Sequence, residues 1–180
     1  MTKLARQAIA ETLAARPGLT IARVDPACLA LVSCVPDTEA ARAAVGAVVG
    51  FALPTEPNRM AGDLTRALAI APGQWLILSD DPNADALATR LAASCFASDI
   101  RDGMAVFELA GPHARDILAM GCALDFDSAA MAPGRCARTA FAGIAIIIHA
   151  VGSRERWRLH LDRAFARHLA EWLKQAATAI

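Results

Sequence analysis

Two segments of the chain repeat one local pattern, a tryptophan-bearing strand that leads directly into a helix with aspartate at its start. The first is residues 74–78 (QWLIL) followed by Asp81-Pro82, and the second is residues 156–161 (RWRLHL) followed by Asp162. Aspartate at this position accepts hydrogen bonds from the free amides of the first helical turn, and proline fits next because it has no N–H to satisfy. The repeat therefore predicts two related half-domains, each an antiparallel sheet with helices on one side.

Turn and strand signals elsewhere agree with this α+β class. Pro72-Gly73 separates two apolar runs, and Ala142-Gly143 separates residues 135–141 from 144–150, so both pairs are predicted as hairpins. Helices are predicted from capping residues and apolar spacing at about 38–51, 81–91, 111–121 and 162–176. Gly121 is expected to end the third of these helices in a left-handed conformation.

The length of 180 residues predicts one compact domain over residues 1–180, with two lobes at about 19–102 and 103–180. A leading helix is predicted within residues 1–18, because the apolar residues between 3 and 15 have helical spacing and Pro17-Gly18 follows them. The antiparallel sheets of the two lobes should each be covered by helices on one side.

The strand before the last helix alternates strictly between apolar and basic side chains. Trp157, Leu159 and Leu161 should face a core, while Arg156, Arg158 and His160 should face solvent. Further arginines, at 135, 138 and 154, make the carboxy-terminal half basic. Such a face is either merely solvated or an interface, because arginine is enriched where proteins bind one another.

Charge and cysteine content exclude several classes of protein. The 18 basic and 18 acidic residues balance, which is unlike the strongly basic domain of a nucleic-acid binder. The odd number of cysteines, five, and their spacing suggest reduced thiols in a cytoplasmic protein. The longest apolar runs, around 43–54 and 142–152, are shorter than the ~20 residues of a membrane span. Neither nucleic acid nor membrane is therefore an expected partner.

Catalytic and cofactor motifs are not found in the sequence. It contains neither a Gly-x-Gly-x-x-Gly nor a P-loop, and no two histidines lie four apart on a predicted helix, so no bound dinucleotide, triphosphate or metal is predicted. Cys122 follows a helix end, where the helix dipole disfavours a thiolate, so a structural role is predicted. Cys136 lies between Arg135 and Arg138 and could be an activated thiolate, or it could turn inward on its strand.

An ordered set of short motifs runs through the chain from residue 58 to residue 144. The motifs read Asn58-Arg59, Ala71-Pro72-Gly73-Gln74-Trp75-Leu76, Leu109-Ala110-Gly111-Pro112-His113-Ala114-Arg115, Met120-Gly121-Cys122, Asp125-Phe126, Pro133-Gly134-Arg135-Cys136-Ala137-Arg138-Thr139 and Phe141-Ala142-Gly143-Ile144. This order resembles the gamma subunit family of heterotetrameric sarcosine oxidase over roughly residues 53–180. Two positions depart from the family pattern, Ala110 where serine is usual and Met120 where lysine is usual.

The resemblance implies a fold similar to the folate-binding domain of the glycine-cleavage aminomethyltransferase. It implies a small non-catalytic subunit that acts in sarcosine catabolism and one-carbon metabolism, with larger alpha, beta and delta subunits as partners. FAD, FMN, NAD, zinc and tetrahydrofolate are implied in those partners and none in this chain. The candidate family-motif and interface residues are Trp75, Gly111, Pro112, Arg115, Gly121, Cys122, Arg135, Arg138, Arg156 and Arg158.

Two other functions remain open at this point. In aminomethyltransferases an aspartate near the start of a strand contacts the pterin, and Asp63 is the local counterpart here. The chain could therefore be a free-standing tetrahydrofolate-dependent protein, either a one-carbon transferase or an iron–sulfur maturation factor. A solitary scaffold or regulator is the third alternative.

Overall fold

The computed structural model describes residues 11–180. Its strands are β1 (Glu11–Arg16), β2 (Leu19–Val24), β3 (Cys28–Ser33), β4 (Met60–Gly62), β5 (Thr65–Ala71), β6 (Gln74–Ser79), β7 (Phe96–Asp99), β8 (Met104–Ala110), β9 (Cys136–Phe141), β10 (Ile144–Val151) and β11 (Ser153–Asp162). Its α-helices are α1 (Glu39–Val49), α2 (Leu87–Ala92), α3 (Ala114–Gly121) and α4 (Ala166–Ala176). None of the helices in this part of the chain is long and apolar enough to cross a membrane.

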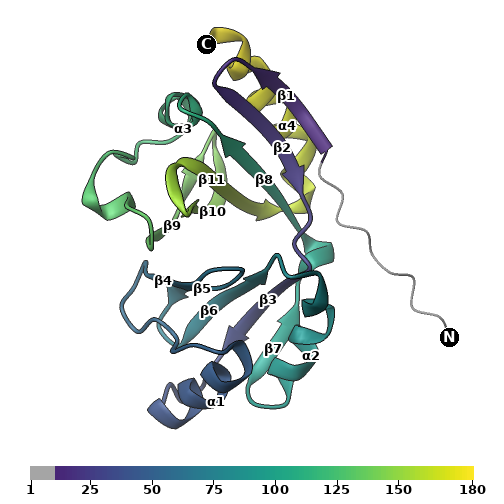
Figure 1. The fold of residues 1–180 in the computed structure, drawn as a ribbon, viewed down its shortest axis with the longest axis vertical. Coiled ribbons are helices and arrows are strands. Elements are labelled where there is room, and N and C mark those ends of the chain that lie inside the picture. The colour runs from purple at the N-terminus through teal and green to yellow at the C-terminus, as the bar shows by residue number, and fades with distance from the viewer. Residues whose placement is uncertain (1–10) are drawn as a thin grey trace, which may run out of the picture.

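The strands form two antiparallel sheets that pack face to face, with helices on the two outer sides (Figure 1). Sheet A has the strand order β1-β2-β8-β11-β10-β9 and is covered by α3 and α4. Sheet B has the order β4-β5-β6-β3-β7 and is covered by α1 and α2. A third apolar cluster, made of strand residues from both sheets, lies between them. The predicted α+β class, with helices on one side of each sheet, is confirmed.

The two sheets repeat one topology, as the two tryptophan-bearing strands predicted. In sheet B the order β4-β5-β6-β3-β7 corresponds strand by strand to β9-β10-β11-β8-β2 in sheet A. Each unit runs from a central strand through a helix to three consecutive antiparallel strands, and then through an aspartate-capped helical segment. The helices are α1 and α2 in one unit and α3 and α4 in the other. The position of β7 in the first unit is occupied in the second by β2, which comes from the start of the chain.

The equivalent strands β4 and β9 meet where the two sheets join. An isolated antiparallel bridge pairs Arg59 with Arg135, and the amide of Met60 donates to the carbonyl of Gly134 at 2.9 Å. The amide of Cys136 donates to the carbonyl of Asn58 at 3.0 Å. Backbone hydrogen bonds therefore fix the two sheets to each other at this edge.

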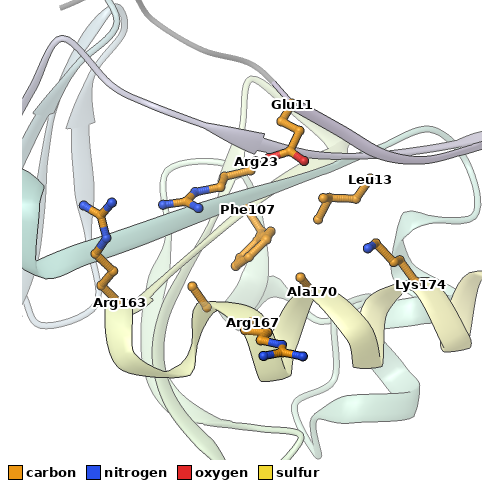
Figure 2. Close-up of a pocket in the computed structure, with 9 residues that line it drawn as sticks. Glu11, Leu13, Arg23, Phe107, Arg163, Arg167, Ala170 and Lys174 are labelled. Atoms are coloured by element: carbon orange, nitrogen blue, oxygen red, sulfur yellow. The ribbon is translucent and has the colours of Figure 1, made fainter.

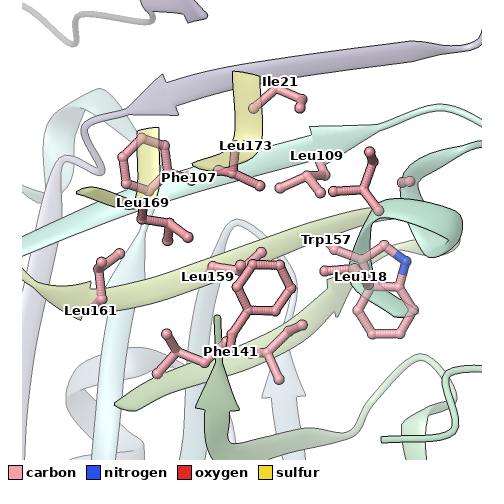
Figure 3. Close-up of a cluster of buried hydrophobic side chains, with 14 of the residues drawn as sticks. Ile21, Phe107, Leu109, Leu118, Phe141, Trp157, Leu159, Leu161, Leu169 and Leu173 are labelled. Atoms are coloured by element: carbon pink, nitrogen blue, oxygen red, sulfur yellow. The ribbon is translucent and has the colours of Figure 1, made fainter. Parts of the chain in front are cut away.

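The largest core lies between sheet A and its two helices (Figure 3). Its fully buried side chains include Phe107, Leu109, Phe141, Trp157, Leu159, Leu169 and Leu173. Two pairs of aromatic rings meet edge to face: Phe126 on Trp157 at 5.3 Å and Phe141 on Trp172 at 5.0 Å between centroids. Rings in this geometry add ~0.5–1.5 kcal/mol beyond their buried area, so α4 and the loop before β9 are both tied to the sheet by aromatic contacts.

At three of the four predicted helix starts, a side chain caps the helix as predicted. The Thr38 hydroxyl accepts from the amide of Ala41, and Gly50 closes α1 with a left-handed φ of 89°. Asp81 and Asp162 each accept an amide hydrogen two residues on, and each begins a short 3₁₀ turn that continues into α2 or α4. The third start lacks a side-chain cap, since His113 precedes α3 without such a bond.

The prediction of a leading helix is wrong for residues 11–16, the part of that segment that the structure describes. Residues Glu11–Arg16 form β1, which pairs with β2 across the turn at Pro17-Gly18, and the rest of the predicted helix lies outside the described residues. Because β2 also pairs with β8, residues 11–24 belong to sheet A rather than to the first lobe. The strands of sheet B therefore begin at Cys28, not at residue 19, and end with β7 at Asp99.

Gly121 does not end α3 in a left-handed conformation. It lies within the helix, and Cys122 follows it in an extended conformation. A Cβ atom on Gly121 would come within 2.6 Å of the ring of Phe141, so glycine is needed here for close packing rather than for a positive φ.

Gly111 combines both constraints and gives the first testable prediction. Its φ is +115°, and a Cβ atom there would lie 2.3 Å from the carbonyl oxygen of Gly18 in the β1–β2 turn. We expect Gly111→Ala to lower the free energy of unfolding by about 1–3 kcal/mol in a urea titration, because both the backbone strain and the clash destabilise the native state. Gly103→Ala is the control, since that glycine has an ordinary φ and nothing within 4 Å of the added atom. Equal losses in the two variants would contradict the explanation.

Candidate functional site: a polar cluster between the sheets

Charged and polar side chains from both sheets meet in the layer between the sheets. Sheet A contributes Glu108 from β8, His149 from β10, and Arg158 and His160 from β11. The antiparallel register places Arg158 opposite both Glu108 and His149 on its two neighbouring strands. Sheet B contributes Arg66 from β5 and Asp80, the residue after β6. We call these six residues the inter-sheet cluster.

Arg158 is the centre of the ionic part of the cluster. Its Nη1 donates to both carboxylate oxygens of Asp80 at 2.8 Å, and its Nε donates to Oε2 of Glu108 at 2.9 Å. Arg66 also donates to Asp80, at 2.9 Å, and the half-exposed Arg156 bonds the other oxygen of Glu108. One guanidinium thus links a carboxylate of sheet A to a carboxylate of sheet B, as the fork geometry of arginine allows.

The surroundings of these charges favour their ionised forms. Burial alone would raise the pKa of Asp80, but hydrogen bonds from Arg158 and Arg66 lower it below its usual value. Burial alone would lower the pKa of Arg158, but Asp80 and Glu108 raise it. Both groups therefore stay charged at neutral pH, and each offsets the desolvation of the other.

The two histidines form a stacked pair in which each hydrogen position can be assigned. A carbonyl oxygen can only accept, so Nδ1 of His149 must donate to the carbonyl of Ala150, 3.1 Å away. Nε2 of His149 is then an acceptor, and Nε2 of His160 donates to it across 3.1 Å. Nδ1 of His160 consequently carries no hydrogen, and within residues 11–180 it has no hydrogen-bond partner. This pattern of donors and acceptors is that of two neutral rings.

Burial makes the neutral form of this pair strongly preferred. His149 is 0% exposed and His160 is 1% exposed. Desolvation lowers the pKa of His149 to about 3 and places the pKa of His160 well below its ordinary value, with the positive charges of Arg158 and Arg66 acting in the same direction. A substrate could reach these rings only if the sheets separated. The arrangement is that of a buried structural contact rather than of an active site.

Metal binding by the cluster does not fit the side chains present. Within the described residues, no group of three or more His, Cys, Asp and Glu side chains is placed to hold a metal ion. The two neighbouring arginines would also repel a cation. The histidine pair therefore serves packing in the layer between the sheets and hydrogen bonding within sheet A.

The predicted solvent-facing side of β11 is wrong for two of its three residues. Arg158 is only 5% exposed and His160 is buried, because sheet B covers this face of sheet A. Only Arg156, whose side chain is 49% exposed, reaches solvent. Strict alternation identifies two faces of a strand, but it does not reveal that a second sheet covers the polar one.

The thiols have no features of reactive cysteines. All five cysteines are free. Burial raises the pKa of Cys136 to about 12 and that of Cys28 to about 11, although Arg135 acts in the opposite direction on Cys136. Cys136 therefore turns inward, and the alternative of an activated thiolate between two arginines is wrong. Cys122 is half-buried, with its Sγ 3.6 Å from the hydroxyl of Thr139.

Comparison with known proteins identifies the family. The family model described as "Sarcosine oxidase, gamma subunit family" matches residues 35–179, which is most of the chain. The chain belongs to the sarcosine oxidase gamma subunit family. No curated protein sequence matches this member of the family.

Solved structures show the same fold as this gamma-family chain. A chain of the heterotetrameric sarcosine oxidase from Corynebacterium sp. U-96, in complex with pyrrole 2-carboxylate, has a TM-score of 0.81 at 24% identity, over 93% of this chain and 88% of that one. The glycine cleavage system aminomethyltransferase T from Bartonella henselae has a TM-score of 0.56 at 15% identity, over 86% of this chain and 43% of that one. The expected similarity to the aminomethyltransferase fold is thus confirmed.

Several residues of the gamma-family motifs have structural roles. Trp75 is buried, and its indole N–H donates to the carbonyl of Pro54 at 2.8 Å, which fixes the loop before β4. Gly111 and the exposed Pro112 make the turn into α3 beside Gly18. Arg115 on α3 pairs with Asp127 and so holds the loop after that helix.

The basic residues of the gamma-family motifs do not form one surface. Arg138 is exposed on β9, Arg135 is half-buried at the β4–β9 contact, and Arg158 belongs to the inter-sheet cluster. Arg154, on β11, donates to the carbonyls of Phe126 and Ser128 and so anchors the loop before β9. The structure brings Arg156 and Arg158 together through Glu108 only.

Five members of the inter-sheet cluster were not predicted as site residues: Arg66, Asp80, Glu108, His149 and His160. One sequence signal could have revealed the layer they occupy. The run 144–151 is apolar at successive as well as alternate positions, which is typical of a strand covered on both faces. A strand of that kind requires a second layer over the face that carries His149, and that layer is sheet B.

Proposed function

We propose that this chain is a small non-catalytic subunit of a heterotetrameric sarcosine oxidase, docked on larger alpha, beta and delta subunits in the cytoplasm. Its contribution to the oxidative demethylation of sarcosine would be structural. The observation that carries the proposal is the family match over residues 35–179, together with a fold shared along almost its whole length with a chain of a heterotetrameric sarcosine oxidase.

Exposed apolar side chains support a docking role. Val35 is 89% exposed and Phe96 is 69% exposed. Val35 follows the end of β3, where Ser33 pairs with Phe96, so Val35 and Phe96 lie at the same end of these two strands. β7 is an edge strand of sheet B. Large apolar groups gathered at an edge are what protein interfaces cover.

The side chains of this chain support the assignment of cofactors to the partners. FAD, FMN, NAD, zinc and tetrahydrofolate would all be held by the larger subunits. The only folate candidate, Asp63, lies in the exposed turn between β4 and β5, outside the inter-sheet cluster. The cluster itself is closed, and its histidines are paired with each other, so it offers neither a flavin cradle nor a pterin site.

Co-expression with the larger subunits of the oxidase from the same organism tests the proposal. We expect the chain to co-elute with them in size-exclusion chromatography at micromolar concentration, and we expect sarcosine turnover only from the assembled complex. Separate elution of this chain would contradict the subunit role. Sarcosine oxidation by the isolated chain, or tightly bound flavin in it, would contradict the non-catalytic role.

Calorimetry with tetrahydrofolate separates the proposal from a free-standing folate-dependent function. No saturable binding by the isolated chain is expected at micromolar concentration. Binding that is lost in Asp63→Ala would favour the folate function instead.

A further inference from the structure

A groove of about 320 Å³ lies between the β1–β2 hairpin and α4, away from the inter-sheet cluster. Figure 2 shows the residues that line it: Glu11, Leu13, Arg23, Phe107, Arg163, Ala166, Arg167, Ala170 and Lys174. Its floor is apolar, formed by the half-buried Leu13 and Ala170 over the buried Ala166 and Phe107, and its rim carries four basic side chains and one acidic one. An apolar floor with a basic rim suits a ligand that has both apolar and negatively charged groups.

The basic side chains of the rim have few acidic partners inside the molecule. Within residues 11–180, neither Arg23 nor Arg167 forms an ion pair. Glu11 is opposite Arg23 in the β1–β2 register, but the two do not form a salt bridge. Arg163 donates to the backbone carbonyl of Asp102, and Lys174 pairs with the exposed Glu171. The rim therefore keeps an excess of positive charge for an incoming group.

The spacing of the charges along α4 favours an extended ligand over a single small anion. Arg163, in the 3₁₀ turn that leads into α4, and Lys174, in the last turn of α4, are eleven positions apart, which is ~16 Å at the rise of a helix. An extended peptide rises ~3.3 Å per residue, so about five residues would span the groove. Alternate side chains of such a peptide point to opposite sides, so carboxylates could reach the rim while apolar side chains rest on Leu13 and Ala170.

We propose that this groove is a docking site for an extended acidic segment of a partner polypeptide, with carboxylates paired to Arg23 and Arg163 at one end and to Lys174 at the other. The identity of the partner rests on the proposed function, and the segment would belong to one of the larger oxidase subunits. Nucleic acid fits less well, because the chain has no net charge and the groove floor is apolar rather than basic throughout.

The first experiment uses the isolated full chain and a fluorescein-labelled hexapeptide of alternating Glu and Leu. Saturable binding is expected, weakened at least about tenfold in Arg23→Glu/Arg163→Glu and at high salt, because like charges then face each other or are screened. Arg138→Glu is the control, since it makes the same substitution at one exposed arginine on the opposite edge of sheet A, with half the charge change of the double variant. Unfolding midpoints equal to that of the unmodified chain will show that the variants are folded.

Glu11→Gln provides a change in the opposite direction. Removing the one carboxylate of the rim should tighten peptide binding several-fold, whereas a general loss of structure could only weaken it. Equal binding by all variants would overturn the proposal, and so would tighter binding of a single-stranded DNA hexamer than of the acidic peptide.

The second experiment repeats the co-elution with the larger subunits, using the groove variant and the control. We expect Arg23→Glu/Arg163→Glu to bind the larger subunits at least about tenfold more weakly than the unmodified chain, with Arg138→Glu unchanged. If the unmodified chain assembles and the groove variant assembles equally well, the groove proposal fails while the subunit role stands. If the unmodified chain does not assemble, the subunit role itself fails.

Discussion

Replacing Arg158 by alanine should lower the free energy of unfolding by about 3–5 kcal/mol, because it removes the buried cation that bonds two partly buried carboxylates. Asp80 would keep only Arg66, and Glu108 would keep only the half-exposed Arg156. Since Asp80 and Glu108 belong to different sheets, the loss should also weaken the contact between the sheets. Urea denaturation at pH 7.5, followed by tryptophan fluorescence, measures the change.

Arg156→Ala is the matched control for this experiment. It removes an arginine from the same strand that also pairs with Glu108, but this side chain is 49% exposed, and exposed ion pairs contribute only ~0–1 kcal/mol. Arg158→Lys should lie between the two, because an ammonium keeps the charge but cannot bond both carboxylates as a guanidinium does. If Arg158→Ala and Arg156→Ala destabilise equally, the buried cluster does not hold the sheets together.

Local signals in the sequence predicted the elements whose stabilising contacts are close in sequence. Asp81 and Asp162 bond amides two residues away, and Ala142-Gly143 takes positive φ at both positions, as a two-residue hairpin turn requires. The repeat of a tryptophan-bearing strand before a capped segment was enough to predict two related half-domains. Each of these features depends on only a few neighbouring residues.

The wrong predictions depend on strand pairing and sheet packing that the local sequence pattern does not show. The segment 11–16 has good helix formers, yet its pairing with β2 determines its conformation. β2 in turn joins sheet A through β8, more than 80 positions along the chain, so the lobe boundary could not be read from local turns. Arg158 looks solvent-facing by alternation, but sheet B covers it and supplies Asp80 as its ionic partner.

The candidate sites were hard to predict because their side chains come from different strands and helices that meet only in the folded chain. Nothing in the neighbourhood of His149 indicates that it stacks on His160, although both lie on strands with a period of two. The groove likewise combines Arg23 from the second strand with Lys174 from the last helix. Motif order identified the family correctly, because that order follows the chain, but it did not locate either set of interacting side chains.

Stability should fall steeply with acidification, and the histidine pair should account for most of the slope between about pH 6.5 and pH 4.5. In the unfolded chain each histidine takes up a proton near its ordinary pKa of 6.5, whereas in the native state the pKa of His149 is lowered to about 3 and that of His160 also falls well below 6.5. The unfolded state therefore binds more protons over this range, so the free energy of unfolding decreases as pH decreases. Each histidine contributes ~1.4 kcal/mol per pH unit, so the pair should contribute up to about 5 kcal/mol at pH 4.5.

A double variant, His149→Gln/His160→Gln, tests this origin of the acid sensitivity. Glutamine keeps a donor and an acceptor but does not titrate, so the variant should lose most of the slope between pH 6.5 and pH 4.5, whatever its stability at pH 7.5. Asp80, whose pKa is lowered, adds its own loss only at more acidic pH, as its carboxylate is protonated. His168→Asn, at an exposed position, is the control and should keep the full slope. The measurement is the unfolding free energy from urea titrations at intervals across this pH range, and an unchanged slope in the double variant would show that other groups cause the acid sensitivity.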